Sequence, residues 1–162
     1  WRHMAKDDHP SCDPRELDYL YNELDKLYGH LAQRCGLSPC AYWMMYEIVS
    51  QGGAALLREM TDSWSYSKQT INSALKKLVD KGLVVLEFEP GSKKNKVVQL
   101  TETGRAFAHA HIVPTISAEE RAFARLGTER QRLLIESTRA YAHALMREFD
   151  ALERLEEGDA AK

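Results

Sequence analysis

Apolar residues recur every three or four positions through the first part of the chain and predict two helices. The first is expected over residues 13–34, where Asp13 and Pro14 supply an N-cap and a first-turn proline. Gly36 then ends it, and a second helix, rich in aromatic and methionine side chains, is expected over residues 39–49. One face of the first helix collects Leu17, Leu20, Tyr21, Leu24, Leu27, Tyr28 and Leu31.

Two further helices are expected in the middle of the chain, a short one over residues 54–60 and a longer one over residues 67–81. Gly82 is placed to give the longer helix a left-handed C-terminal cap. A tight turn between two helices, with polar residues opening the second, is typical of a helix-turn-helix. The buried face of the second helix is predicted to comprise Ile71, Ala74, Leu75, Leu78 and Val79.

Two apolar runs, residues 83–88 and 96–100, predict the strands of a β-hairpin. The connection begins with Glu89-Pro90-Gly91-Ser92. Proline followed by glycine at the centre of a turn favours type II geometry. A helix-turn-helix followed by such a hairpin is the order of elements in a winged helix.

The remaining chain predicts helices only. One is expected over residues 101–113, with an interruption at Pro114 and a restart at Ser117. A capping box of Thr128 and Gln131 opens the last helix, which is expected to end near residue 155. Its apolar set is long for one domain to bury alone and comprises Leu133, Leu134, Tyr141, Leu145, Phe149 and Leu152.

Composition places the chain among ordinary globular proteins, since 28% of its 162 residues are charged and 44% are hydrophobic. No run of about 18 apolar residues and no signal-peptide pattern occurs, so we expect a cytoplasmic protein without a membrane partner. Residues 1–3, ahead of Met4, are expected to be left over from cloning. Residues 158–162 are expected to form a disordered tail.

The net charge is −2, but it is unevenly distributed. Residues 65–96 hold seven lysines against three carboxylates, whereas the first helix is acidic. Such polarity suits a protein that turns one side toward a polyanion. A solvated helix face beside a lysine-rich hairpin is the alternative.

The polar side chains around the fourth helix and the hairpin tip have the chemistry of a DNA-binding site. Gln69 and Asn72 are of the types that pair with adenine, and Lys68 can donate to guanine, whereas the later lysines suit phosphate. Each of them alone is also compatible with an ordinary solvated side chain. The candidate DNA-binding residues are Ser65, Ser67, Lys68, Gln69, Thr70, Asn72, Ser73, Lys76, Lys77, Lys93, Lys94 and Asn95.

Cysteine and histidine offer little further chemistry. Cys12, Cys35 and Cys40 are odd in number and lack a CxxC spacing, so they predict free thiols. A peroxide-sensing thiol is one interpretation, and simple packing is the other. His109 and His111 lie two positions apart on a helix and therefore face different sides. We expect no metal site and no cofactor.

The segment over residues 37–104 resembles the MarR family of bacterial transcriptional regulators. The motifs that carry the resemblance are SKQTINSALKKLVDKGLV, in the fourth helix and first strand, and QLTETG before the next helix. The flanking helices extend it over residues 17–155. It implies a mainly α fold with a small β-hairpin wing, in which residues 4–36 and 102–157 form a helical dimerisation region and residues 37–101 form a winged helix-turn-helix lobe.

The resemblance implies a homodimeric, sequence-specific DNA-binding regulator, expected to be a repressor of a near-palindromic operator that a small aromatic ligand or an oxidant releases. The wing departs from the family pattern, because an Asp-x-Arg pair is replaced by Lys93-Lys94-Asn95-Lys96. Contacts weighted toward phosphate are therefore expected. A ligand pocket is implied near aromatic and histidine side chains for which core packing is the alternative, namely Tyr28, His30, Tyr42, Trp43 and Tyr46.

Two other functions remain open at this point. A winged helix without a DNA target could serve protein–protein interaction, but it would present an apolar recognition surface. An enzyme is not expected, because no nucleophile elbow, phosphate loop, metal-ligand spacing or paired catalytic carboxylates stand out. Thiol-based peroxide chemistry is the nearest enzymatic alternative.

Overall fold

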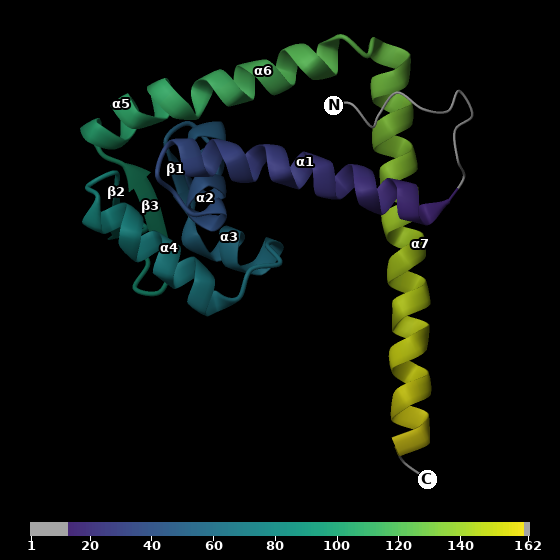
Figure 1. The fold of residues 1–162 in the computed structure, drawn as a ribbon. Coiled ribbons are helices and arrows are strands. Elements are labelled where there is room, and N and C mark those ends of the chain that lie inside the picture. The colour runs from purple at the N-terminus through teal and green to yellow at the C-terminus, as the bar shows by residue number, and fades with distance from the viewer. Residues whose placement is uncertain (1–12, 161–162) are drawn as a thin grey trace. The chain divides into compact units, whose positions relative to one another are not determined.

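The computed structural model describes residues 13–160 as a mainly helical fold with a small antiparallel sheet, which confirms the expected fold class (Figure 1). It divides into two compact units at residues 114 and 115. The helices are α1 (Pro14–Arg34), α2 (Pro39–Ser50), α3 (Leu57–Ser63), α4 (Lys68–Asp80), α5 (Glu102–His111), α6 (Val113–Ala124) and α7 (Thr128–Ala160). The strands are β1 (Ala54–Leu56), β2 (Val84–Phe88) and β3 (Lys96–Leu100).

The predicted helix starts are confirmed by side-chain caps. Asp13, Ser38, Ser67 and Thr101 each have extended backbone and accept a hydrogen bond from a backbone N–H of the following turn. A cap of this kind satisfies one of the N–H groups that the first turn of a helix leaves without a partner. Four short polar side chains thus determine where α1, α2, α4 and α5 begin.

The sheet has the order β1-β3-β2, with both pairs antiparallel. The helix expected over residues 54–60 is wrong in its first half, because Ala54–Leu56 pairs with β3 as β1 and only the following residues form α3. Gly53 has a φ of 105° and its carbonyl accepts the Leu100 N–H at 2.9 Å. Pairing with β3 therefore overrides the helical preference of alanine and leucine.

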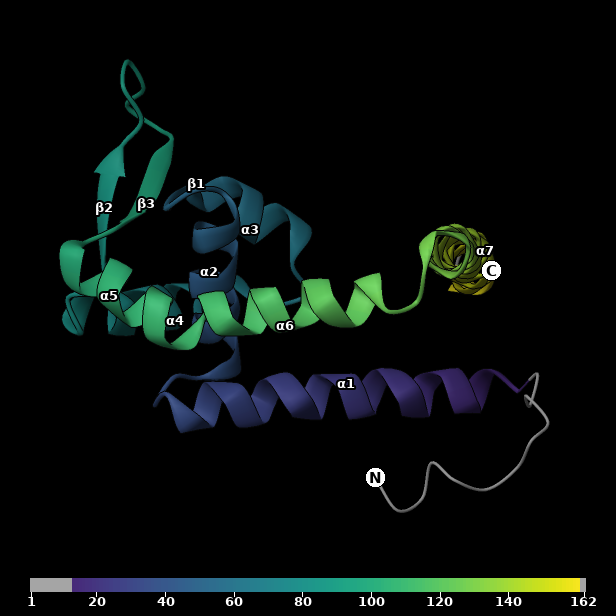
Figure 2. The same cartoon turned by 90° about the horizontal axis from the view of Figure 1, so that it is seen from above.

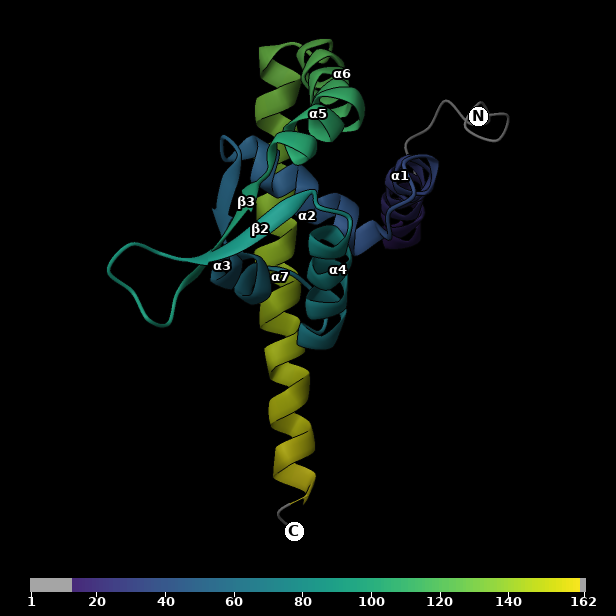
Figure 3. The ribbon, with the colours of Figure 1, turned by 90° about the vertical axis from the view of Figure 1, so that its left-hand side faces the viewer.

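The hairpin between β2 and β3 has the predicted turn. Ser92 N–H donates to the Glu89 carbonyl at 2.9 Å, and Gly91 between them has a φ of 81°. A positive φ at the third position is what a type II turn requires. The hairpin projects from the rest of the first unit, as Figures 2 and 3 show.

The core of the first unit lies between α2, α4 and the sheet. α2 is buried on most of its surface, whereas α4 buries a single stripe. That difference leaves α4 with one face for packing and one for solvent. The largest fully buried side chains are Tyr42, Met44, Met45, Ile48, Met60, Ile71, Leu78, Ile112, Val84 and Val98.

A tight junction joins the end of α4, the start of β2 and the start of α5. The Thr101 hydroxyl donates to the Gly82 carbonyl at 2.6 Å and accepts the Gly104 N–H at 2.8 Å. Thr101 N–H donates to the Leu83 carbonyl at 3.1 Å. A Cβ added to Gly104 would lie 1.8 Å from that same Leu83 oxygen, so only glycine fits here.

The helices at the C-terminal end differ from the prediction at three points. α6 begins at Val113, not at Ser117, because Pro114 is tolerated in a first turn, where its missing N–H is not needed. The Gln131 amide donates to the Phe123 carbonyl at 2.7 Å instead of closing a capping box. α7 continues to Ala160, so most of the expected tail is helical, while residues 161–162 lie outside the described part.

We expect Gly104→Ala to lower the free energy of unfolding by about 3 kcal/mol, because the new methyl group meets backbone that cannot move aside. Urea unfolding followed by circular dichroism measures the change. Gly29→Ala is the matched control, since nothing lies within 4 Å of its Cβ position. It should leave stability unchanged or raise it by up to about 1 kcal/mol. Equal stabilities of the two variants would contradict the junction's role.

Candidate nucleic-acid interface and adjacent pocket

The face of α4 opposite the core is polar and exposed. Ile71, Ala74, Leu75 and Leu78 are buried, and the helical period places Gln69, Ser73 and Lys76 opposite them. All seven candidates on the helix are exposed, namely Lys68, Gln69, Thr70, Asn72, Ser73, Lys76 and Lys77. Amide, hydroxyl and ammonium groups along one helix face can read base edges and hold phosphates.

Two of the candidate residues at the start of α4 form hydrogen bonds that stabilise its first turn. The Ser67 hydroxyl accepts the Thr70 N–H at 3.1 Å and shares a second hydrogen bond of 2.8 Å with the Thr70 hydroxyl. Both hydroxyls thus have partners within the chain. Gln69, Asn72 and Ser73 are the candidates best placed to contact bases, and Ser65 lies exposed in the segment before the cap.

The tip of the hairpin presents lysine on an internally bonded loop. Lys93 and Lys94 are exposed, whereas Asn95 is half-buried and its amide donates to a Glu89 carboxylate oxygen at 2.7 Å. The Ser92 hydroxyl accepts the backbone N–H groups of Lys94 and Asn95 at 3.2 and 2.9 Å. Asn95 therefore orders the loop. The exposed ammonium groups of the two lysines are available to bind a phosphate.

A third hairpin lysine is visible in the structure but was not among the candidates. Lys96 Nζ lies 5.8 Å from the centre of the Phe88 ring, its partner across the strands. Phe88 is 58% exposed, so this cation–π pair lies on the surface. The facing positions of the two residues in a predicted hairpin were the available signal.

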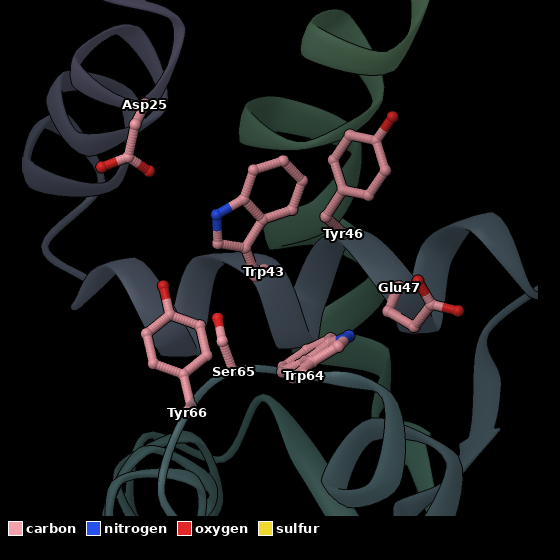
Figure 4. Close-up of a pocket in the computed structure, with 7 residues that line it drawn as sticks. All are labelled: Asp25, Trp43, Tyr46, Glu47, Trp64, Ser65 and Tyr66. Carbon is pink, nitrogen blue, oxygen red and sulfur yellow. The ribbon is translucent and has the colours of Figure 1, made fainter. Parts of the chain in front are cut away.

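An open pocket of about 410 Å³ lies between α1, α2 and the segment before α4 (Figure 4). Trp43 and Tyr46, two of the five predicted ligand residues, line it. Tyr28 packs on Trp43 with ring centres 4.5 Å apart but is not itself a lining residue. Tyr42 is 1% exposed and belongs to the core, and His30 is exposed outside the pocket.

Sequence reasoning did not anticipate most of the lining. The further lining residues are Asp25, Glu47, Trp64, Ser65 and Tyr66. Trp64 and Tyr66 pack edge to face with centres 6.2 Å apart. Two large aromatic side chains in an otherwise polar turn were the signal that could have identified this wall.

The described cysteines do not have the environment of a reactive thiol. Burial raises the pKa of Cys35 and of Cys40. The Cys35 thiol also donates to the Ala32 carbonyl at 3.3 Å. A raised pKa lowers the thiolate fraction at neutral pH and therefore the reactivity. Cys12 lies outside the described residues.

Residues 13–160 give no support for a metal site or for a membrane-spanning helix. This part of the chain contains no group of three or more His, Cys, Asp or Glu side chains that could hold a metal ion. In the same region, every helix is too short or too polar to cross a membrane.

Comparison with known proteins gives a family match in the segment that carries this interface. A model of the MarR family matches residues 35–94, which include α2, α3, α4, β2 and most of the wing loop. The match thus covers the helix-turn-helix and the first strand of the hairpin, and not the flanking helices α1, α5, α6 and α7. No curated protein matches the chain significantly.

Solved structures of MarR regulators share the fold. A MarR family regulator from Neisseria meningitidis is similar with a TM-score of 0.70 and 20% identity, covering 84% of this chain and 95% of that one. A putative MarR family regulator from Listeria monocytogenes, solved with a 26mer DNA, has a TM-score of 0.66 and 16% identity, with coverages of 89% and 95%.

A third similar structure contains a small molecule. It is an organohalide-sensing transcriptional regulator in its 2,4-dichlorophenol-bound form, with a TM-score of 0.57, 11% identity and 88% coverage of both chains. The family whose model matches residues 35–94 is one of DNA-binding transcriptional regulators.

We expect Ser67→Ala to lower the free energy of unfolding by about 1 kcal/mol, because it removes the cap of α4. Thermal and urea unfolding measure the loss. The control is Ser73→Ala on the exposed face of the same helix, which should change stability by less than about 0.5 kcal/mol. A cap variant as stable as the control would show that α4 does not depend on Ser67.

Proposed function

We propose that the protein is a homodimeric transcriptional repressor that inserts α4 into the major groove of a near-palindromic operator and is released by a small organic ligand. The observation that carries the proposal is the exposed polar row Gln69, Ser73 and Lys76, placed opposite the buried stripe of a firmly capped helix. A helix of this kind presents side chains to base edges while its other face stays packed.

The wing supplies the second set of DNA contacts. Lys93 and Lys94 stand exposed on the loop that Glu89 and Asn95 close. Lysine is a point charge without the planar fork of arginine, so these contacts position the protein on phosphate and add little sequence preference. Specificity then rests on α4.

Exposed apolar side chains support a homodimer. On α1, Leu24 and Leu27 are 52% and 50% exposed, and on α7, Met146 and Phe149 are 62% and 57% exposed. Large apolar residues repeated along helix faces are typical of surfaces that another chain covers. In a dimer the two α4 helices meet successive major grooves roughly 34 Å apart, which requires a near-palindromic site.

Release by a ligand is supported by where the pocket lies. Its wall Trp64-Ser65-Tyr66 directly precedes the Ser67 cap, so an occupant acts on the segment from which α4 starts. For the two described cysteines, Cys35 and Cys40, the raised pKa favours a ligand over an oxidant. A protein–protein module without a DNA target is disfavoured, because the exposed face of α4 is polar.

Replacing Lys93 and Lys94 together by alanine should weaken binding to all DNA sequences alike. The slope of log affinity against log salt should fall by about 2, since two phosphate contacts are lost. Mobility shifts on operator and random DNA, over a range of salt, measure both quantities. The matched variant is Asn72→Ala, which should cost about 1–3 kcal/mol on the operator only. Equal losses on both DNAs for Asn72→Ala would contradict its assignment to base contact.

Met146→Glu combined with Phe149→Glu should convert the dimer to a monomer, because two carboxylates would have to be buried in an apolar contact. Sedimentation velocity measures the mass in solution. Arg147→Glu is the control, since it adds negative charge at an exposed polar position between them. A double variant that stays dimeric would remove α7 from the proposed interface.

A further inference from the structure

We infer that the pocket in front of α4 selects an organic cation, such as a substituted ammonium carrying an aromatic or aliphatic group, and discriminates against aromatic acids. This inference rests on the proposed ligand-released function and names the chemical class of the ligand. It follows from the rings and the charges that line the pocket.

Four aromatic side chains provide ring faces. Trp43 and Tyr46 on α2 lie with ring centres 5.3 Å apart, and Trp64 and Tyr66 lie 6.2 Å apart on the opposite wall (Figure 4). The rings of each pair are tilted or edge to face and not stacked flat, so each ring keeps at least one face that its partner in the pair does not cover. Tryptophan and tyrosine faces attract ammonium groups through the negative potential of the ring.

The only ionisable side chains with formal charge at neutral pH among the seven described lining residues are Asp25 and Glu47. Figure 4 shows the Asp25 carboxylate pointing from α1 toward the side of the pocket with Trp43 and Tyr66. No lysine, arginine or histidine belongs to this described lining. An anionic guest would therefore meet two carboxylates without a counter-charge.

The groups beside the two carboxylates do not pair either of them with a cation. Lys26, beside Asp25 in the chain, donates to Glu23 at 2.7 Å. Gln51 donates its neutral amide to Glu47 at 2.7 Å. Within residues 13–160, neither Asp25 nor Glu47 has a salt-bridge partner.

Tyr66 contributes a neutral ring with a hydroxyl. Burial raises the pKa of Tyr66, and the neighbouring Cys40 and Asp25 raise it further. The side chain consequently stays a neutral phenol, and it adds no charge to the pocket. Its hydroxyl can donate a hydrogen bond to a polar atom of the guest.

The test is isothermal titration of the full chain with benzyltrimethylammonium, benzoate and benzyl alcohol, which share a ring and differ in charge. We expect benzyltrimethylammonium to bind at least about tenfold more tightly than benzoate, with benzyl alcohol between them. Asp25→Asn should weaken the cation about three- to tenfold and leave benzyl alcohol unchanged. Asp18→Asn, the same change on the exposed part of α1 outside the pocket, should have no effect.

A second variant tests the rings. Trp64→Leu should weaken the cation by at least about threefold while the far-ultraviolet spectrum stays that of the parent. Benzoate binding as tight as the cation, no binding of the cation at millimolar concentration, or equal effects of Asp25→Asn and Asp18→Asn would each overturn the inference. Mobility shifts of the ligand-free protein distinguish failure of this inference from failure of the proposed function. If the protein binds DNA but not the cation, only the inferred class of ligand is wrong.

Discussion

The carbonyl oxygen of Leu83 occupies the space where any residue but glycine at position 104 would place its Cβ. Around this contact, the Thr101 hydroxyl donates to the Gly82 carbonyl just after α4 and accepts the Gly104 N–H in the first turn of α5. Three elements therefore meet in one joint made of backbone and a single side chain. Because backbone groups cannot change rotamer, α4, the sheet and α5 hold a fixed geometry at this point.

The segment from Trp64 to Thr70 serves three purposes within seven positions. Trp64 and Tyr66 form a pocket wall, Ser67 and Thr70 close the first turn of α4, and Gln69 between them faces solvent. These residues can have different roles although they are close in sequence, because successive side chains at the start of a helix point in different directions. The pocket wall is thus joined to the first turn of α4 through covalent neighbours and one cap.

Elements specified by local signals were predictable, whereas those decided by distant partners were not. The caps at Asp13, Ser38, Ser67 and Thr101 and the turn at Gly91 depend on neighbours only, and all are confirmed. By contrast, β1 forms because it pairs with β3. The Gln131 side chain does not close the predicted capping box, because it donates to a carbonyl eight positions earlier in the chain. The pocket is lined by Asp25 from α1 and by Glu47 from α2, so it requires the packing of α1 on α2. Periodicity cannot distinguish Tyr42 in the core from Trp43 beside it at the pocket.

The hydrogen bond between Asn95 and Glu89 has a consequence for the thermodynamics of association. A lysine loop that is ordered only by its contact with phosphate would lose conformational entropy on binding. Here the turn at Gly91, the Ser92 hydroxyl and the Asn95 amide already restrict the backbone that carries Lys93 and Lys94. Much of the conformational entropy of the loop backbone is thus lost during folding. On binding, mainly the two lysine side chains would lose further conformational entropy.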